Sequence, residues 1–341
     1  MRITQQEIAR LANVSQATVS RVVAGDPRVE PEIRERVQQV MRQHNYQPDV
    51  RARSLRTRQT HLVGLVLKRT PEDLQGDPFF SLFVSEILGF LSSTPYHLCV
   101  DIAASELRQE HVYDELLRTR RVDGVILVES APSDDRIKRL QSEGFPFVLV
   151  GNPGASNLPS VDNDNVLAGR IATQHLIDQG YTRIGFLTGP EGLTVSHDRA
   201  EGYRQAICEA GQEPLVVYSD FGFAPARAAA QKMLATHRGL DAMVVLDDYM
   251  AMGAIDAARE AHLPIPTGLG VVGFNDTSLC NLVPGGLTSV SLNIEEVVRQ
   301  ACGKLLRIIE GRADGEEPRL IVPSELKIRG SSTRDRKAAM V

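Results

Sequence analysis

The sequence of 341 residues predicts an N-terminal all-α domain followed by a larger α/β body with two lobes built on parallel sheets. Two observations support this prediction. Residues 1–47 place apolar side chains at helical spacing between helix-capping residues. From Leu62 onward, short continuous apolar segments alternate with amphipathic helical segments, which is typical of parallel strands covered by helices on both faces. A chain of this length also exceeds one ordinary core, so it should divide into units.

Residues 4–24, TQQEIARLANVSQATVSRVVA, predict two short helices joined by a tight turn. Thr4 and Glu7 have the spacing of a capping box, in which each side chain satisfies a free backbone donor at a helix start. Ile8, Leu11 and Ala12 then fall on one face. This first helix therefore begins after Thr4 and turns an apolar face inward.

The second helix is expected to follow after three or four residues, the turn length of a helix-turn-helix. Asn13 can end the first helix, Ser15 can cap the second, and Gly25 can stop it. Its apolar stripe consists of Val19, Val22 and Val23.

The opposite face of this second helix offers hydrogen-bond donors and no acid: Gln16, Ala17, Thr18, Ser20 and Arg21. The start of a recognition helix enters the major groove first, so Gln16 and Ala17 should reach base edges. Glutamine suits adenine, alanine a thymine methyl group, and Arg21 suits guanine or phosphate. The alternative is a three-helix domain whose surface is merely polar.

A third helix is expected from Pro31, with the apolar stripe Ile33, Val37, Val40 and Met41. Residues 49–57, DVRARSLRT, allow one more helix capped by Asp49. At this length it would be marginally stable alone, so it is either a solvated linker or a helix that a partner stabilises.

Charge is distributed unevenly along the chain. Residues 1–60 hold 11 basic and 6 acidic residues, whereas residues 61–341 hold 27 basic and 37 acidic ones. A basic head on an acidic body fits nucleic-acid contact confined to the head, although solvation alone would produce the same counts.

Other classes of protein are disfavoured by what the sequence lacks. Its four cysteines are scattered without metal-ligand spacing, and it contains no Ser-His-Asp order, P-loop or HExxH motif. The segment Gly268–Gly273 matches GxGxxG, but its apolar residues are themselves a predicted strand and not a strand-to-helix turn. We therefore expect no catalytic residue, cofactor or metal. No apolar run approaches 18 residues, so a cytoplasmic protein outside the membrane is expected.

The body contains eight predicted strands in two successive sets, which indicates two similar lobes. The first set is LVGLVL, YHLCVDI, DGVILV and FPFVLV, and the second is RIGFLTG, PLVVY, AMVVL and LGVVGF. The chain should cross between the lobes near residues 160–165, with further crossings near 275–290 and 318–332.

In an open parallel sheet, ligands bind beyond the carboxyl ends of the strands. Polar residues follow several predicted strands at that point or in the loop after it: Asn152, His197, Asp198, Arg199, Asp247, Asp248, Asn275 and Asp276. Asp248 and Asp276 have the alternative role of helix caps.

The segment VSQATVSRVVAGDPRVEPEIRERVQQVMRQHNYQPDVRARSL resembles the N-terminal signature of the lactose-repressor (LacI/GalR) family of bacterial transcription regulators. The resemblance extends to about Ser332. It departs at Ala24, where the family usually has asparagine, which puts one DNA contact in doubt.

The resemblance implies a helix-turn-helix DNA-binding domain, a hinge helix and a periplasmic-binding-protein-like core with an effector in the cleft. The implied DNA contacts are Thr4, Ser15, Gln16, Ala17, Thr18, Ser20 and Arg21 in the head and Ala52, Arg53 and Leu55 in the hinge, with Leu55 as a minor-groove wedge. The implied effector contacts are Phe79, Phe80, Asn152, Asp162, Arg199, Phe221, Asp247 and Asn275.

We expect three parts: a head at residues 1–47, a hinge at 48–60 and the two-lobed body at 61–341. Lobe 1 is assigned to about 61–160 plus 276–290, and lobe 2 to about 163–275 plus 291–320. The expected function is a homodimeric repressor that binds double-stranded operator DNA under the control of a small-molecule effector. The carboxylate of Asp247, the guanidinium of Arg199 and the amide of Asn275 form a hydrogen-bonding set for vicinal hydroxyls, and Phe221 can stack on a sugar ring, so a sugar effector is favoured. Leu193 and Val195 stand where purine-binding relatives have polar residues, which argues against a nucleobase. The alternative is a cytosolic sugar-binding module or sugar enzyme.

Overall fold

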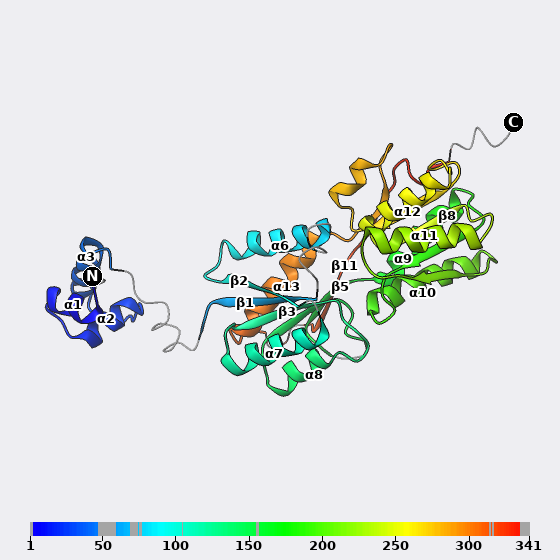
Figure 1. The fold of residues 1–341 in the computed structure, drawn as a ribbon. Helices are drawn as coiled ribbons and strands as arrows, with labels where there is room; N and C mark the ends of the chain where they lie inside the picture. The colour runs from blue at the N-terminus through cyan, green and yellow to red at the C-terminus, as the bar shows by residue number, and fades with distance from the viewer. Residues whose placement is uncertain are drawn as a thin grey trace. The chain divides into compact units, whose positions relative to one another are not determined.

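The computed structural model describes residues 3–46, 59–68, 74, 77–103, 105–154, 157–313, 315 and 317–334 (Figure 1). The chain folds as two compact units, the head (Met1–Thr60) and the body (His61–Val341). The predicted hinge residues Ala52, Arg53 and Leu55 lie outside the described residues.

The head is built from three helices: α1 (Gln5–Leu11), α2 (Gln16–Val23) and α3 (Pro31–Gln43). The predicted capping box is present, because the Glu7 backbone N–H donates to Thr4 Oγ1 and the Thr4 N–H donates to Glu7 Oε2. Asn13 adopts φ +52° in the turn, and Ser15 Oγ accepts a 3.1 Å hydrogen bond from the Thr18 N–H. The two helices therefore begin and end where the sequence predicts.

The core of the head is closed by all three helices and consists of Ile8, Ala9, Ala12, Val19, Val22, Val29 and Val37. The sequence predicts Leu11 on the inner face, but this side chain is 44% exposed. Ala9 is buried in its place, because the inner face of α1 centres on Ile8 and extends to the residues one and four positions after it. The two remaining helices agree with their predicted stripes.

The first lobe of the body contains a six-stranded, fully parallel sheet in the order β11-β5-β4-β3-β1-β2. Its strands are β1 (Leu62–Leu67), β2 (His97–Ile102), β3 (Gly124–Val128), β4 (Phe147–Val150), β5 (Ser160–Asn163) and β11 (Arg319–Val322). Its helices are α6 (Pro78–Leu91), α7 (Glu106–Thr119), α8 (Asp135–Ser142) and α13 (Ile294–Ile309). Figure 1 shows α6 and α13 on one face of the sheet and α7 and α8 on the other.

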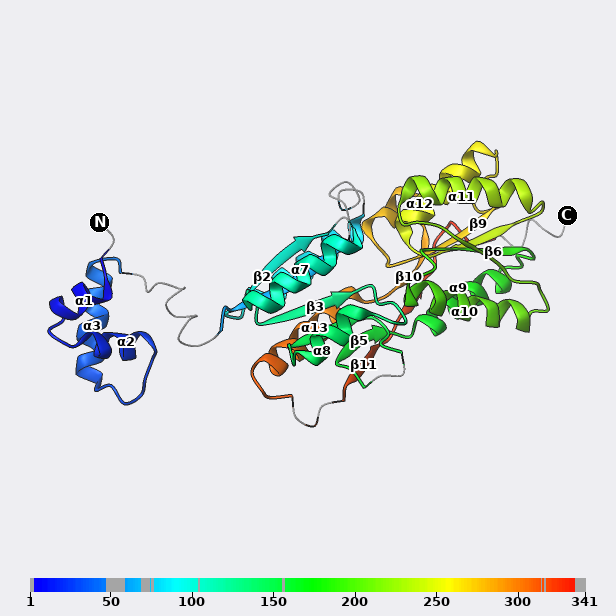
Figure 2. The same cartoon turned by 60° about the horizontal axis from the view of Figure 1, so that its bottom comes forward.

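The second lobe repeats this plan with the strand order β12-β10-β9-β8-β6-β7. Its strands are β6 (Ile184–Thr188), β7 (Leu215–Tyr218), β8 (Ala242–Val245), β9 (Gly270–Phe274), β10 (Thr288–Ser291) and β12 (Glu325–Lys327). Its helices are α9 (Asn165–Asp178), α10 (Thr194–Glu209), α11 (Phe223–Thr236), α12 (Asp248–Glu260) and the 3-10 helix η1 (Ser278–Leu282). Figure 2 shows α9 and α10 on one face and α11 and α12 on the other. The edge strand β12 runs antiparallel to β10, so this sheet is mixed. The sequence predicts purely parallel sheets, and in this lobe that prediction is wrong at the edge.

Two later segments of the body, residues 276–291 and 294–322, lie in the lobes opposite to those assigned from the sequence. They are called the returning segments below. Residues 276–291 stay in the second lobe, because η1 packs on α12 and β10 pairs with β9. Residues 294–322 return to the first lobe, because α13 packs on β3, β4 and β5 and β11 pairs with β5. The chain therefore crosses after β5, between β10 and α13, and between β11 and β12.

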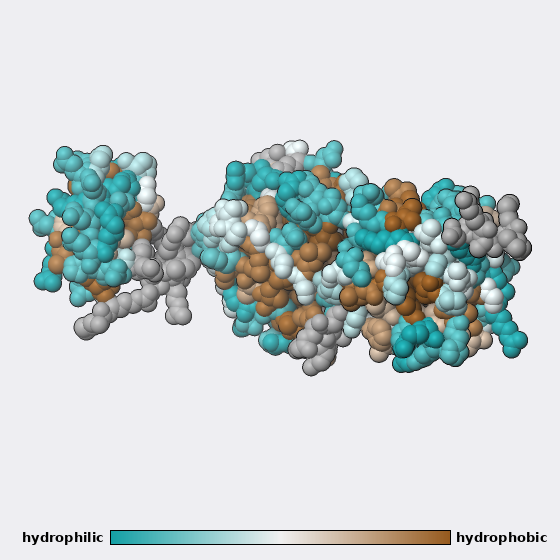
Figure 3. All heavy atoms as spheres, turned by 90° about the horizontal axis from the view of Figure 1, so that it is seen from above, coloured by the Kyte–Doolittle hydropathy of each residue, from teal (hydrophilic) through white to brown (hydrophobic). Residues whose placement is uncertain are grey.

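Part of the apolar surface of the body remains exposed on the first lobe. The strand β2 is an edge strand, and its Val100 and Ile102 are each 41% exposed, while Leu88 on α6 is 51% exposed. Figure 3 shows apolar surface on the face of the body seen from above, where α6 lies. Within the described part of the chain, every helix is too short or too polar to traverse a lipid bilayer.

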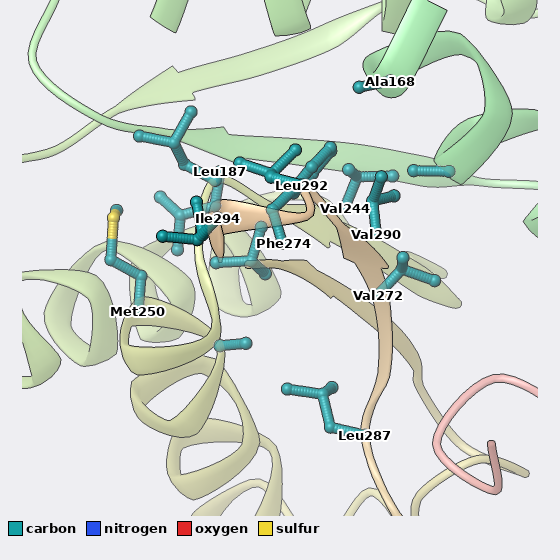
Figure 4. Close-up of a cluster of buried hydrophobic side chains, with 14 of the residues drawn as sticks. Ala168, Leu187, Val244, Met250, Val272, Phe274, Leu287, Val290, Leu292 and Ile294 are labelled. Atoms are coloured by element: carbon teal, nitrogen blue, oxygen red, sulfur yellow. The ribbon is translucent and has the colours of Figure 1, made fainter. Parts of the chain in front are cut away.

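The largest buried cluster continues from one lobe into the other. Figure 4 shows Leu187, Phe274, Leu292 and Ile294 gathered where the chain passes from β10 to α13. All four side chains are at most 7% exposed. The segment that crosses from β10 to α13 is thus part of the core.

Candidate functional site

The predicted reading face of α2 lies on the surface of the head. Gln16, Ala17 and Arg21 are exposed, and Thr18 and Ser20 are half-buried. Ser15 and Thr4 are occupied as helix caps, and Ser15 Oγ also lies 2.8 Å from Thr18 Oγ1. The side chains that are free to contact a DNA groove are therefore those at the start and in the middle of α2.

A cavity of about 130 Å³ lies between the two lobes of the body. All eight predicted effector residues line it: Phe79, Phe80, Asn152, Asp162, Arg199, Phe221, Asp247 and Asn275. The first lobe contributes mainly the aromatic start of α6 and the ends of β3, β4 and β5, and the second lobe contributes the ends of β8 and β9. The cavity therefore lies at the carboxyl ends of the parallel strands of both sheets.

Arg199 on α10 lines the cavity and is only 5% exposed. Its Nε donates to Asn165 Oδ1 at 2.9 Å, and its Nη1 donates to the Leu246 carbonyl oxygen at 2.5 Å. Its guanidinium carbon lies 4.4 Å from the ring centroid of Phe274. Burial lowers the pKa of this guanidinium to about 10, so it stays charged at neutral pH.

Two carboxylates flank the arginine, and burial raises the pKa of each to about 7. Asp162 accepts from Asn165 Nδ2 at 3.0 Å and lies 3.6 Å from Arg319 Nη2. The pKa of Asp247 is raised further by the charge of Asp77, while Arg199 opposes both shifts. Near neutral pH each of these groups can accept or donate a hydrogen bond.

The helix cap at the end of β8 is Asp247, not Asp248. Asp247 Oδ1 accepts from the Met250 N–H at 2.7 Å. Asp248 turns into the lobe, where its oxygens accept from Thr277 and Ser289. Asp276 pairs with Arg329 at 2.6 Å and caps no described helix. Asp247 thus both caps α12 and lines the cavity.

Hydrogen bonds join the lobes along one side of the cavity. Asn152 Nδ2 donates to Asp198 Oδ2 at 2.8 Å, and the hydroxyls of Ser130 and Thr194 lie 2.8 Å apart. These contacts hold the lobes together across the cavity at two points.

Sequence reasoning missed five polar lining residues: Asp77, Glu129, Ser130, Asn163 and Asn165. Glu129 and Ser130 directly follow β3, so the rule used for the other strand ends would have found them. Asp77 caps α6 and Asn165 begins α9, and nothing in the local pattern separates them from ordinary helix starts.

The glycine motif at residues 268–273 and the grouping of metal-binding side chains can be examined in the described part of the chain. Gly270 and Gly273 lie inside β9, so the GxGxxG match does not open a helix. Among the described residues, no three His, Cys, Asp or Glu side chains are grouped to hold a metal ion.

Similarity to known proteins extends over nearly all of the chain. Residues 4–49 match the model described as bacterial regulatory proteins, lacI family, and residues 173–332 match a periplasmic binding protein-like domain. The chain is 32% identical to the HTH-type transcriptional regulator CelR of Thermobifida fusca, over 97% of this chain and 98% of that protein. It is 31% identical to the ribose operon repressor of Halalkalibacterium halodurans, over 96% of each chain.

Solved structures agree with these matches. A complex of the transcriptional regulator CelR with cellobiose has a TM-score of 0.74 at 30% identity and covers 97% of this chain and 100% of that one. The Lac repressor dimer bound to operator and the anti-inducer ONPF has a TM-score of 0.85, covering 98% and 100% of the two chains. At 23% identity, the latter likeness concerns the fold.

Proposed function

The chain belongs to the lacI family of bacterial regulatory proteins, and we propose that it is a DNA-binding repressor of carbohydrate-utilisation genes controlled by a sugar. The observation that carries the proposal is that one cavity between the lobes gathers Arg199, Asp247, Asn275 and Phe221, in a chain whose head exposes a donor face. We place the protein in the cytoplasm with its DNA, and we propose that it catalyses no reaction, as its relatives are named regulators.

Operator recognition is assigned to the exposed start of α2. Gln16 and Ala17 would contact base edges in the major groove, and Arg21 would contact guanine or a phosphate. Thr4, Ser15, Thr18 and Ser20 would approach the backbone, since helix starts and hydroxyls commonly contact phosphates. In the hinge, Arg53 would contact phosphates, and Ala52 and Leu55 would enter the minor groove.

We propose that the protein acts as a homodimer, because an operator read by two heads needs two half-sites about one helical turn apart. The exposed side chains Leu88, Val100 and Ile102 on α6 and β2 support this. An edge strand with apolar neighbours is a surface that proteins normally cover.

The chemistry of the cavity supports a neutral sugar as effector. Among the described residues, five carboxyl groups line it and only one guanidinium does: Asp77, Glu129, Asp162, Asp198, Asp247 and Arg199. This balance disfavours a phosphorylated or carboxylated ligand, whereas carboxylates and amides accept and donate hydrogen bonds to vicinal hydroxyls. Phe79 and Phe221 offer apolar surface to a sugar ring. The relative CelR was solved with cellobiose.

Control of DNA binding would come from a change in the arrangement of the lobes. A ligand that binds one arrangement more tightly shifts the population toward it. We propose that this shift alters the spacing of the two hinge segments in the dimer and thereby favours or disfavours their ordering on DNA.

The test combines DNA binding with ligand binding. Duplex DNA is titrated against the protein at several salt concentrations, and a panel of mono- and disaccharides is screened by thermal shift. We expect DNA affinity that falls steeply with salt and at least one sugar that raises the melting temperature. Asp247→Ala should abolish the response of DNA binding to that sugar while leaving DNA binding itself intact. A protein that binds sugar but no DNA at low salt would instead be a sugar-binding module or a sugar enzyme.

A further inference from the structure

The loop that follows α2 in the head carries an ion pair. Asp26 lies just after the end of α2, and its carboxylate accepts from Arg28 Nε at 3.0 Å and from Arg28 Nη2 at 2.8 Å. We propose that Arg28 reads a guanine beside the bases contacted by α2, and that Asp26 is the positioning residue that holds the guanidinium for this contact. The inference rests on the proposed DNA-binding function and adds a base contact to it.

The backbone of this loop is fixed to the head by several hydrogen bonds. The Asp26 carbonyl oxygen accepts from the Val29 N–H at 3.2 Å and from Arg34 Nη2 at 2.5 Å. Val29 belongs to the core of the head, and the Arg28 N–H donates to Asp26 Oδ1 at 3.0 Å. A paired guanidinium on a fixed loop has less conformational freedom to lose on binding, which favours affinity for a matching partner.

The pairing with Asp26 occupies one edge of the guanidinium and leaves another edge for DNA. A guanidinium has five N–H donors in a planar fork. Asp26 uses the donor of Nε and one donor of Nη2, so both donors of Nη1 and the second donor of Nη2 remain. The Arg28 side chain is 85% exposed, so these donors can be reached from outside. Two parallel donors of this kind match O6 and N7 of guanine in the major groove.

The pair lies beside the reading face of α2. The Asp26 N–H donates to the Arg21 carbonyl oxygen at 3.0 Å, which folds the loop back on the last turn of the helix. The hydrogen bonds from Arg28 hold the pKa of Asp26 below its usual range, and the charge of Arg21 contributes to the same shift. Arg21 is exposed on the face assigned to the major groove. Asp26 therefore lies between two arginines, one of which is already assigned to DNA.

The acid in this pair favours a base contact over a phosphate contact. Asp26 and Arg28 together carry no net charge, and a carboxylate close to the duplex repels phosphates. An unpaired arginine that contacted a phosphate would strengthen binding to any DNA, whereas a base contact strengthens binding only to the matching sequence. The pair is therefore suited to discrimination between sequences.

The test uses the full-length protein and random DNA. The wild type and Arg28→Lys each select binding sites from a library of random duplexes, and affinities for the selected duplex and for a random duplex are measured by fluorescence anisotropy. Lysine keeps the charge but lacks the planar fork. We expect Arg28→Lys to lose the preference for one guanine in each half-site and to bind the wild-type sequence about five- to 150-fold more weakly. Its affinity for the random duplex should not change.

Arg36→Lys is the matched control for this variant, because Arg36 is an exposed arginine on α3. It should select the wild-type sequence with wild-type affinity.

Asp26→Asn tests the role of the acid, because asparagine can still accept the Arg28 N–H but carries no charge. Arg28 can then neutralise a phosphate, so the slope of log K against log salt on the random duplex should steepen by about 0.9. The preference for the guanine should weaken as well. A merely structural role of Asp26 would change the melting temperature and leave the slope as it was. Glu35→Gln, which removes an exposed acid from α3, is the control and should leave the guanine preference intact.

The outcomes separate this inference from the proposed function. If Arg28→Lys selects the same sequence as the wild type, or loses affinity equally for the selected and random duplexes, the base contact is refuted and the DNA-binding function stands. An unchanged salt slope in Asp26→Asn would refute the positioning role of the acid. If the wild type selects no sequence, the proposed function fails and this inference fails with it. Thermal denaturation of each variant recognises loss of affinity through unfolding.

Discussion

Asn163 donates a 2.8 Å hydrogen bond from its side-chain amide to the carbonyl oxygen of Val322. The same nitrogen donates to the carbonyl oxygen of Leu292 at 3.0 Å. These three residues belong to the three segments that cross between the lobes, so a single buried side chain joins all of the crossings. Asn163 also borders the cavity, which places this junction next to the ligand.

Asn163→Ala should therefore lower the stability of the body and loosen the crossing. Two buried carbonyl oxygens would lose a donor, at about 1–3 kcal/mol. For a unit of this size that corresponds to a fall of about 2–5 °C in melting temperature. Asn281→Ala, at an exposed asparagine in η1, is the control and should change little. Equal melting temperatures for the two variants would contradict the role of Asn163.

Gly202→Ala should destabilise the body because α9 and α10 meet without room for a side chain. A Cβ at residue 202 would overlap the Val166 carbonyl oxygen and lie within 2.7 Å of the Arg170 nitrogen. The resulting overpacking costs about 1–3 kcal/mol, and because α10 carries Arg199, sugar affinity should fall as well. Thermal denaturation and calorimetry measure the two effects.

Gly89→Ala is the matched control for Gly202→Ala. Gly89 lies within α6, and no described atom is within 4 Å of the position of an added Cβ. Alanine is a better helix former than glycine, so this variant should be as stable as the wild type or about 0.5–1 kcal/mol more stable. Similar losses in both variants would show that the close approach of α9 and α10 is not the cause.

Asp247→Asn should stabilise the protein at pH 8 more than at pH 5. The pKa of Asp247 is raised to about 7 by burial, whereas in the unfolded chain it returns to about 4. The folded state therefore holds the proton more tightly, and its stability decreases as the pH rises from about 4 to about 7 and is constant above. Asparagine keeps the cap on α12 but never ionises, so it avoids this loss.

Melting temperatures at pH 5 and pH 8 measure this difference for the wild type and Asp247→Asn. The control is Asp164→Asn, which changes an exposed aspartate that caps α9 in the same manner. A stabilisation by Asp247→Asn that is independent of pH, or that is larger at pH 5, would refute the buried titration.

Arg21→Ala should weaken binding to a specific operator by about 1–3 kcal/mol, or roughly fivefold to 150-fold, if the side chain contacts guanine. The affinity is measured by fluorescence anisotropy with labelled duplexes. Arg118→Ala removes the same charge from an exposed position on α7 in the body and should leave DNA affinity unchanged. Unchanged affinity in Arg21→Ala would remove this residue from the reading surface.

Leu55→Ser should reduce specific DNA binding more than non-specific binding, because a wedge acts only where the central base step can be unstacked. Specific and random duplexes of equal length are compared at one salt concentration. Equal losses on both duplexes would argue against a wedge.

The sequence by itself determined the local elements and their order. Capping residues such as Thr4 and Ser15 act within one turn of their helices, so their hydrogen bonds agree with the prediction. The strand ends also lie where continuous apolar segments stop, which is why Asn152, Asp247 and Asn275 were found and all border the cavity.

Tertiary structure alone decided which lobe each returning segment joins and which of the adjacent residues Asp247 and Asp248 caps a helix. A strand pattern does not specify its partner, so β11 and α13 could be assigned only from pairing and packing on the first sheet. Likewise, two adjacent aspartates are equivalent in sequence, yet Asp247 caps α12 while Asp248 accepts hydrogen bonds from Thr277 and Ser289. The physical reason is range: capping and periodicity act over a few residues, whereas pairing and burial depend on segments far apart in the chain.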